Sequence, residues 1–132
     1  MSCKSCLYAV NGTTQSVSDG GLINFGAVAR RYGQNAYMSG GNIEILGSGY
    51  YDINTNFTLV ASGAGTATIT LMKDGTAISG ASASLTVESG STYALAIPAV
   101  LRQMCCCESS ITAMLSGVTG TVANATMIVE KL

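Results

Sequence analysis

The chain has no histidine, no tryptophan and only one proline among its 132 residues. The absence of histidine removes the commonest general base and the triads and dyads that depend on it. The sequence also lacks a G-x-S-x-G elbow, a P-loop, and a G-x-G-x-x-G motif after a predicted strand. Carboxylates are scarce, and Asp52 and Glu88 stand alone on the outward faces of predicted strands. We therefore expect no catalytic residue and no cofactor, and we predict that the protein is not an enzyme.

Charge is scarce as well. Charged residues make up 10% of the chain and hydrophobic residues 48%, whereas roughly 25% of an ordinary soluble domain is charged. So few charges do little to keep the surface of one copy away from that of another. We therefore expect part of the surface to be buried in an oligomer or on a larger assembly.

Basic blocks and long apolar runs are also missing. The net charge is −1 and Arg30-Arg31 is the only basic pair, so the clustered cations of a nucleic-acid-binding surface are absent. No apolar run approaches the ~20 residues of a membrane-spanning helix. The first ten residues, MSCKSCLYAV, do not resemble a secretory signal. We expect no nucleic-acid partner, no membrane, and a protein that stays in its cell or leaves it by lysis.

Strand patterning dominates what is present, and it is clearest between Gly49 and Gly75. In two successive runs, alternate residues are apolar, which is the pattern of a sheet that is packed on one side and wet on the other. Small residues 62–65 separate the runs, and Asp74-Gly75 after them favours a type I′ turn. We predict two antiparallel strands that form a hairpin, and their inward residues are Tyr51, Ile53, Thr55, Phe57 and Leu59, then Ala67, Ile69 and Leu71.

Further short strands follow from the same pattern. Pro98 has no backbone N–H to donate to a neighbouring strand, so the predicted strand that contains it is an edge strand or has a bulge at that position. Ala83–Glu88 and Thr92–Leu101 read as a second hairpin, turned by residues 89–91. No segment has a convincing helical period, and we count about eight or nine short strands. This pattern predicts a β-sandwich or a β-barrel. The other predicted strands are Leu22–Tyr32 (Ile23, Phe25, Ala27 and Ala29 on one face), Asn42–Leu46 (Ile43 and Ile45 inward), Ser110–Ser116 and Thr121–Leu132.

Residues 1–21 lack this alternation and are rich in turn-forming polar residues. We therefore predict an N-terminal attachment arm at 1–21 and a single domain at 22–132. The apolar residues Leu7, Tyr8 and Val10 are the only part of the arm able to bury appreciable area, so they are the predicted contacts with a larger particle.

The order of these pieces resembles the tumour-necrosis-factor/complement-head-like jelly roll, in particular its bacterial and bacteriophage versions. The resemblance rests on Gly49-Tyr50-Tyr51, GTATITLMKDG, ASLTVESGSTYALAI and a last strand ending in MIVEKL. It implies an all-β antiparallel jelly-roll sandwich of about eight to ten strands. It also implies a homotrimer in which aromatic and aliphatic residues meet at the threefold axis. The candidates for the core or that axis are Tyr51, Ile53, Phe57 and Leu59.

Five cysteines are the one chemical oddity. Cys3, Cys6, Cys105, Cys106 and Cys107 include enough thiols for a zinc site, but neighbours on a strand point to opposite faces. A disulfide between the arm and residues 105–107 is an alternative. The third reading is small buried hydrophobic residues in a reducing cytoplasm, and we prefer it, so that no metal is expected.

Several tyrosines are predicted to be exposed. They suit either stacking on sugars or a protein interface, where aromatic residues are enriched. We interpret three matches to the glycosylation sequon, at Asn11, Asn56 and Asn124, as chance matches, because we expect no secretory signal. The tyrosines are Tyr8, Tyr32, Tyr37 and Tyr50.

These features favour a structural protein of a bacteriophage particle: a trimeric jelly roll at the virion surface, assembled in the host cytoplasm, that decorates the capsid. Its expected partners are itself and the major capsid protein or another virion protein. The alternatives are a tail- or head-fibre tip that binds a host receptor or surface glycan, and a bacterial surface or spore-coat protein. Fold alone does not separate these functions.

Overall fold

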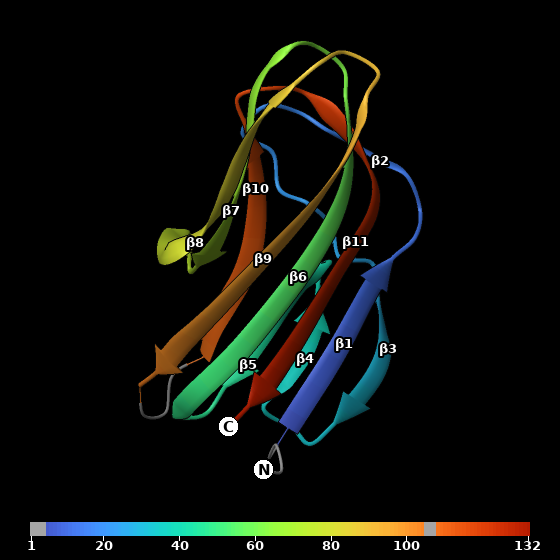
Figure 1. Ribbon diagram of the computed structural model, residues 1–132. Helices are drawn as coiled ribbons and strands as arrows, with labels where there is room; N and C mark the ends of the chain where they lie inside the picture. Colours follow the sequence, from blue (N-terminus) through green and yellow to red (C-terminus); the bar gives the residue numbers. More distant parts are fainter. Residues whose placement is uncertain (1–4, 105–107) are drawn as a thin grey trace.

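The computed structural model describes residues 5–104 and 108–132, which fold into two packed layers of β-sheet (Figure 1). None of these residues lies in a helix, so none belongs to a helix that could span a membrane. The strands of the described residues are β1 (Ser5–Asn11), β2 (Gln15–Val17), β3 (Ala27–Tyr32), β4 (Ala36–Ser39), β5 (Asn42–Leu46), β6 (Gly49–Ala61), β7 (Gly65–Lys73), β8 (Thr76–Val87), β9 (Thr92–Gln103), β10 (Glu108–Ser116) and β11 (Gly120–Lys131).

Two antiparallel sheets form the layers. Sheet A has the strand order β3-β1-β11-β6-β9, and β2 pairs with the part of β11 that β1 does not reach. Sheet B has the order β4-β5-β10-β7-β8. Because the first and last strands are neighbours in sheet A, both termini lie at the same end of the sandwich (Figure 1). The predicted all-β jelly-roll sandwich is confirmed, with eleven strands in place of about eight to ten.

The predicted hairpin between Gly49 and Gly75 is wrong in its pairing. β6 pairs with β11 and β9 in sheet A, whereas β7 pairs with β10 and β8 in sheet B. The second predicted hairpin fails in the same way, since β8 lies in sheet B and β9 in sheet A. Alternation specifies which side chains a strand buries, but it does not specify which strand lies beside it. In both cases the intervening loop carries the chain from one layer to the other.

The predicted turn at Asp74-Gly75 is confirmed. It joins β7 to β8 within sheet B, and its two central residues have φ angles of 52° and 81°. A type I′ turn needs positive φ at both positions, and Asp and Gly are residues that tolerate it. The turn therefore sets the register of the pairs beside it, Lys73–Thr76 and Met72–Ala77, before the register shifts between Thr70 and Met72.

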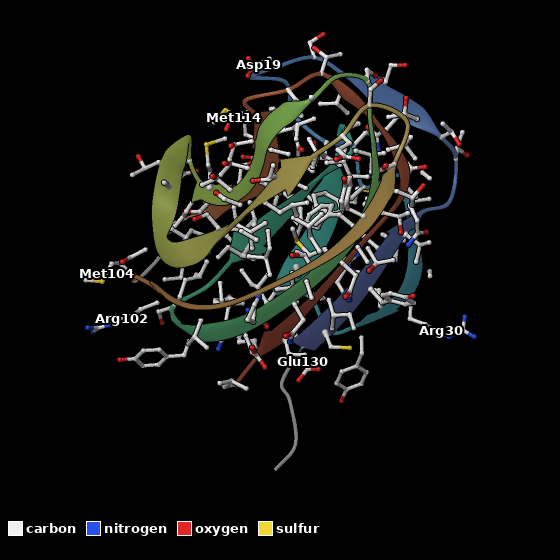
Figure 2. The ribbon with its side chains drawn as sticks, turned by 45° about the horizontal axis from the view of Figure 1, so that its top comes forward. Asp19, Arg30, Arg102, Met104, Met114 and Glu130 are labelled. Atoms are coloured by element: carbon white, nitrogen blue, oxygen red, sulfur yellow. The ribbon has the colours of Figure 1, made fainter. Side chains whose placement is uncertain are left out.

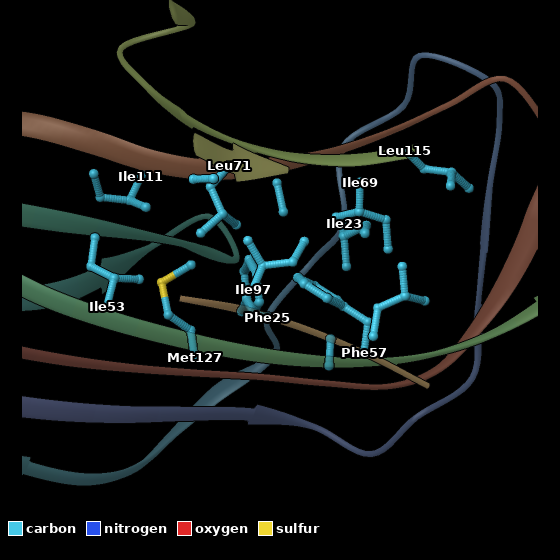
Figure 3. Packing of buried hydrophobic residues seen from close by; sticks show 14 of the residues in the cluster. Ile23, Phe25, Ile53, Phe57, Ile69, Leu71, Ile97, Ile111, Leu115 and Met127 are labelled. Atoms are coloured by element: carbon cyan, nitrogen blue, oxygen red, sulfur yellow. The ribbon is translucent and has the colours of Figure 1, made fainter. Parts of the chain in front are cut away.

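The hydrophobic core fills the space between the sheets (Figure 3). The inward residues of β6 form its centre, and the ring of Phe57 lies 5.8 Å from that of Phe25 in a tilted arrangement, which is within the favourable range for aromatic pairs. Each of the four β6 candidates is at most 1% exposed in the single chain, so none is available to contact a second copy. These residues are Tyr51, Ile53, Phe57 and Leu59.

The structure contradicts the predicted arm at residues 1–21 where it describes the strands of residues 5–17, while residues 1–4 lie outside the described residues. Residues 5–11 form β1, which lies between β11 and β3, and residues 15–17 form β2. Leu7 and Ala9 are completely buried. A Leu-x-Ala pair beside a polar, turn-rich stretch is too short a pattern to reveal a strand whose main partner is the last strand of the chain. The jelly roll therefore includes at least residues 5–17 of the predicted arm.

In the structure, the predicted strand Leu22–Tyr32 is divided into two segments that pair with different sheets. Residues 20–23 bond to β10, where the Ile23 N–H donates to Ala113 O at 2.9 Å, while β3 pairs with β1 in the other sheet. Gly26 joins them at φ 74°, in a position where a Cβ atom would collide with the backbone of β1. Ile23 and Phe25 are buried as predicted, whereas every residue of β3 is exposed.

Candidate assembly surface

The outward face of sheet A contains two of the predicted contact residues, Tyr8 and Val10. Strand alternation turns every second residue of β1, β11, β6 and β9 away from sheet B. The pairing registers place these residues in rows across the sheet, and cross-strand neighbours on one face are close enough to touch. Three rows are Val10–Thr126–Asn56–Ala96, Tyr8–Ile128–Asn54–Pro98 and Cys6–Glu130–Asp52–Val100.

The β9 end of this face is apolar and exposed. Its outward residues from Ala94 to Val100 are small or aliphatic, and the Val100 side chain is 62% exposed; the next outward residue is the exposed Arg102. β9 is an edge strand, because its hydrogen-bonded partner in sheet A is β6 alone and Pro98 blunts its free side. The predicted edge position of Pro98 is therefore confirmed. Such an edge resists extension by another strand but leaves a smooth surface for packing; its other outward residues are Ala94 and Ala96.

The outward face of sheet B differs in kind. Paired strands β7 and β8 present hydroxyl groups in register, and one pair, Thr68 Oγ1 and Ser84 Oγ, is hydrogen-bonded at 2.8 Å. A face of hydroxyls satisfies its polar groups with water and gains little from burial. The outward face of sheet A, which is apolar on its β9 side, is therefore the better candidate for assembly. The sheet B hydroxyls come from Thr66, Thr68, Thr70, Ser82, Ser84 and Thr86.

The three predicted contact residues do not act together. Leu7 is fully buried in the core and cannot insert into a neighbouring subunit while the sheet is intact. Tyr8 and Val10 face outward from sheet A and are half-buried. The strand pairing of β1 therefore separates the predicted triplet into one core residue and two surface residues.

Two shallow hollows lie elsewhere. One of 330 Å³ is lined by Asp19 and by residues 62–64 and 117–119 at the loop end opposite the termini. The carboxylate of Asp19 accepts the Gly117 N–H at 2.8 Å, so this side chain already fixes the β10–β11 turn. A second hollow of 190 Å³ lies beside Leu22 and Asn42. Neither contains the apolar walls and convergent polar groups of a typical ligand site.

The cysteine alternatives receive no support from the described residues. These residues include no group of three or more His, Cys, Asp or Glu side chains placed to hold a metal ion. Cys6 faces outward from β1 and is half-buried. Cys3 and Cys105–Cys107 lie outside the described residues, so the disulfide and zinc alternatives stay predictions.

Two ionisable side chains with shifted pKa values fasten loops rather than form a site. Burial raises the pKa of the Tyr51 phenol, opposed by a hydrogen bond with Asn35. The pKa of the Asp74 carboxyl is lowered, mainly because it accepts the Ser110 backbone N–H at 2.9 Å, and further by the Ser109 hydroxyl. Both groups lie outside the outward face of sheet A.

No model of a known protein family and no curated protein matches this chain. Solved structures do match it. Murine APRIL has a TM-score of 0.74 at 13% identity, covering 97% of this chain and 98% of its own. Eiger, a TNF from S. frugiperda, has a TM-score of 0.72 at 10% identity, covering 100% and 94%. The PRD1 vertex protein P5 has a TM-score of 0.67 at 12% identity, covering 100% and 99%.

These likenesses establish the fold: two antiparallel sheets in a TNF/C1q-like jelly roll. The resemblance stated from the strand order is thus confirmed at the level of fold. TNF/C1q-like domains are non-enzymatic binding or structural modules that typically form homotrimers.

Sequence reasoning missed the outward face of sheet A because it followed the inward residues of each strand. The signal was nevertheless present in the run Thr92–Leu101, where the outward positions are small or aliphatic instead of charged. A strand with apolar residues at both alternate sets is typical of burial on both sides. That pattern in an edge strand points to an assembly contact.

Proposed function

We propose that this protein is a structural component of a bacteriophage particle, a homotrimeric jelly roll at the virion surface that decorates the capsid. The main support is the similarity of the whole chain to the PRD1 vertex protein P5, with nearly complete coverage of both chains. The low charge of the chain also fits a protein that works inside a larger assembly. Assembly with the particle would take place in the host cytoplasm.

The outward face of sheet A is the proposed trimer contact. It combines exposed aliphatic residues at β9 with half-buried apolar residues, Tyr8 and Ile128, on β1 and β11. Burying such a face removes apolar area from water at roughly 25 cal/mol per Å² before the cost of association. The hydroxyl face of sheet B would then point away from the threefold axis.

Attachment to the shell is assigned to the end of the sandwich that carries the termini, in place of a separate arm. Exposed apolar side chains gather there: Leu46 is 43% exposed, Met104 59% and Leu132 42%. The pairing of Leu46 with Glu108 and the hydrogen bond from Leu132 N–H to Tyr50 O, 3.0 Å long, place them at this end. The partner would be the major capsid protein or another virion protein.

The experiment is particle binding. Particles of the phage that encodes the chain, grown with its gene deleted, are mixed with purified protein and sedimented. The wild type should co-sediment, and a variant carrying Leu46→Asp and Leu132→Asp should remain in the supernatant as a folded trimer. Wild-type protein that stays in the supernatant would contradict the virion role; binding by the variant would contradict only the assigned end.

A second candidate function is a fibre tip that binds a host glycan. The exposure of Tyr32, 66%, and Tyr50, 54%, favours it, because free aromatic rings stack on sugars. Glycan-array binding that Tyr32→Ala or Tyr50→Ala abolishes would support this alternative over capsid decoration.

A further inference from the structure

The outward face of sheet A carries one pair of like charges. Asp52 on β6 and Glu130 on β11 are directly opposite each other in the antiparallel register, so their side chains share one face. Both are half-buried. Neither carboxylate makes a hydrogen bond or ion pair with any described residue. Like charges directly opposite destabilise a sheet, and no described residue compensates this repulsion.

An exposed cation lies on the same face at the β9 edge. Arg102 is exposed and pairs in register with Tyr50, two residues from Asp52 along β6. Its guanidinium makes no hydrogen bond or ion pair with a described residue. Figure 2 shows Arg102 projecting from one edge of the sheet and Arg30 from the other, with Glu130 between them. The face therefore carries complementary charges that are not paired with one another among the described residues.

We propose that Arg102 of one copy binds the Asp52–Glu130 pair of the next copy, and that this contact fixes a head-to-tail arrangement in the trimer. This inference rests on the proposed homotrimer and adds the residues that determine its geometry. A threefold interface is heterologous, so one patch of a subunit meets a different patch of its neighbour. The β9 edge with Arg102 is one such patch, and the β6–β11 part of the face is the other.

The heights of these groups along the strands agree with this arrangement. Rotation about an axis parallel to the strands keeps each residue at the same height. Arg102 is two residues below the Asp52 row, which is about 7 Å along a strand, a distance that an extended arginine side chain covers. One guanidinium offers five donors in a planar fork, so it can bond two carboxylates at once.

The neighbouring residues make the contact dry on one side. Val100 precedes the arginine by two residues on the same face and is directly opposite Asp52 in its own chain. When β9 packs against the next copy, Val100 and Pro98 exclude water around the charges, which strengthens their attraction. A partly exposed pair of this kind is weakened by salt, so the trimer should dissociate more readily as NaCl concentration rises.

The test measures the trimer dissociation constant of the full chain by sedimentation velocity over a dilution series. Arg102→Glu should raise the constant on the order of tenfold or more, and Asp52→Arg with Glu130→Arg should do the same. All three changes in one chain restore opposite charges and should return the constant close to the wild-type value. Arg30→Glu, with the same change of charge at the other edge, should leave it unchanged. Circular dichroism confirms that each variant is folded.

Three results would overturn the pairing: an unchanged constant for Arg102→Glu, an equal loss for Arg30→Glu, or failure of the triple reversal to restore assembly. Each of these leaves the trimer itself in place. A wild-type chain that is monomeric throughout the dilution series would instead contradict the homotrimer, so the two failures are distinguishable.

Asp52→Asn should change two quantities in opposite directions: it should stabilise the monomer and weaken the trimer. It removes the repulsion with Glu130, so the diluted monomer should melt at a higher temperature than wild type. It also removes one acceptor for the neighbour's arginine, so the trimer should dissociate at a higher protein concentration. A purely structural role for Asp52 predicts that both quantities move together, and that result would refute the assignment.

Discussion

The hydroxyl of Tyr51 links the core to the β5–β6 turn. Its ring is fully buried, and its oxygen lies 3.0 Å from Leu46 O and 2.8 Å from Gly47 O. A phenol donates one proton, so the two carbonyls share it. Residue type and alternation were sufficient to predict that this tyrosine is inward. Its partner carbonyls were not predictable, because they depend on the conformation of the β5–β6 turn.

Truncation of the central aromatic residues should be costly. Tyr51→Ala and Phe57→Ala should each lower the free energy of unfolding by about 3–5 kcal/mol, since each leaves a cavity between the sheets. Tyr51→Phe should cost about 1 kcal/mol, the net worth of one hydrogen bond. Chemical denaturation measures these values. Tyr32→Ala, at an exposed site, is the control and should change stability by less than about 0.5 kcal/mol; a loss under 1 kcal/mol for both alanine variants would contradict the packing.

Asp74 should make stability depend on pH. Its folded pKa lies below its unfolded value, so its contribution is complete above the unfolded pKa and is lost as pH falls through the lowered folded pKa. Asp74→Asn keeps the turn, because asparagine tolerates the φ of 52°, but it cannot titrate. Stability of the wild type should therefore fall more steeply than that of the variant between neutral and acidic pH. Parallel curves in denaturant titrations would refute this role.

At the scale of elements, local alternation predicted strands well and their neighbours poorly. Asn42–Leu46 is a strand with Ile43 and Ile45 buried, as predicted. The partners of β6 are β11 and β9, which lie far away in sequence, and no local signal specifies them. The turn at Asp74-Gly75 was predicted correctly, because its residue chemistry fixes its geometry, although the strand that follows it was not predicted to begin at Thr76.

Strand β1 gives a test of its place in the sheet. Leu7→Ala should lower the free energy of unfolding by about 2–5 kcal/mol, because Leu7 is fully buried. Tyr8→Ala, at the next position but facing outward, is the matched comparison and should cost clearly less in the monomer. Thermal and denaturant unfolding of the two variants measure the difference. Equal and small effects at both positions would restore the original interpretation of residues 1–21 as an arm.

At the scale of the whole molecule, the two outward faces divide the surface by chemistry. Strands β7 and β8 of sheet B present hydroxyls, whereas sheet A presents aliphatic residues and a set of charges that the described residues leave unpaired. Composition predicted that part of the surface would be covered. It could not locate that part, because the face appears only when four strands from distant parts of the sequence, β1, β11, β6 and β9, lie side by side. The candidate site therefore depended on topology.

The central claim is that the β9 side of sheet A is buried in a homotrimer, and native mass spectrometry of wild type and Val100→Asp tests it directly. At micromolar concentration the wild type should have the mass of three chains. Val100→Asp should have the mass of one folded chain, because Val100 is 62% exposed in the monomer and a carboxylate there would be buried in the interface. Leu22→Asp, at a 50% exposed residue beside sheet B, should remain trimeric. A wild type with the mass of one chain, or a trimeric Val100→Asp, would contradict the account.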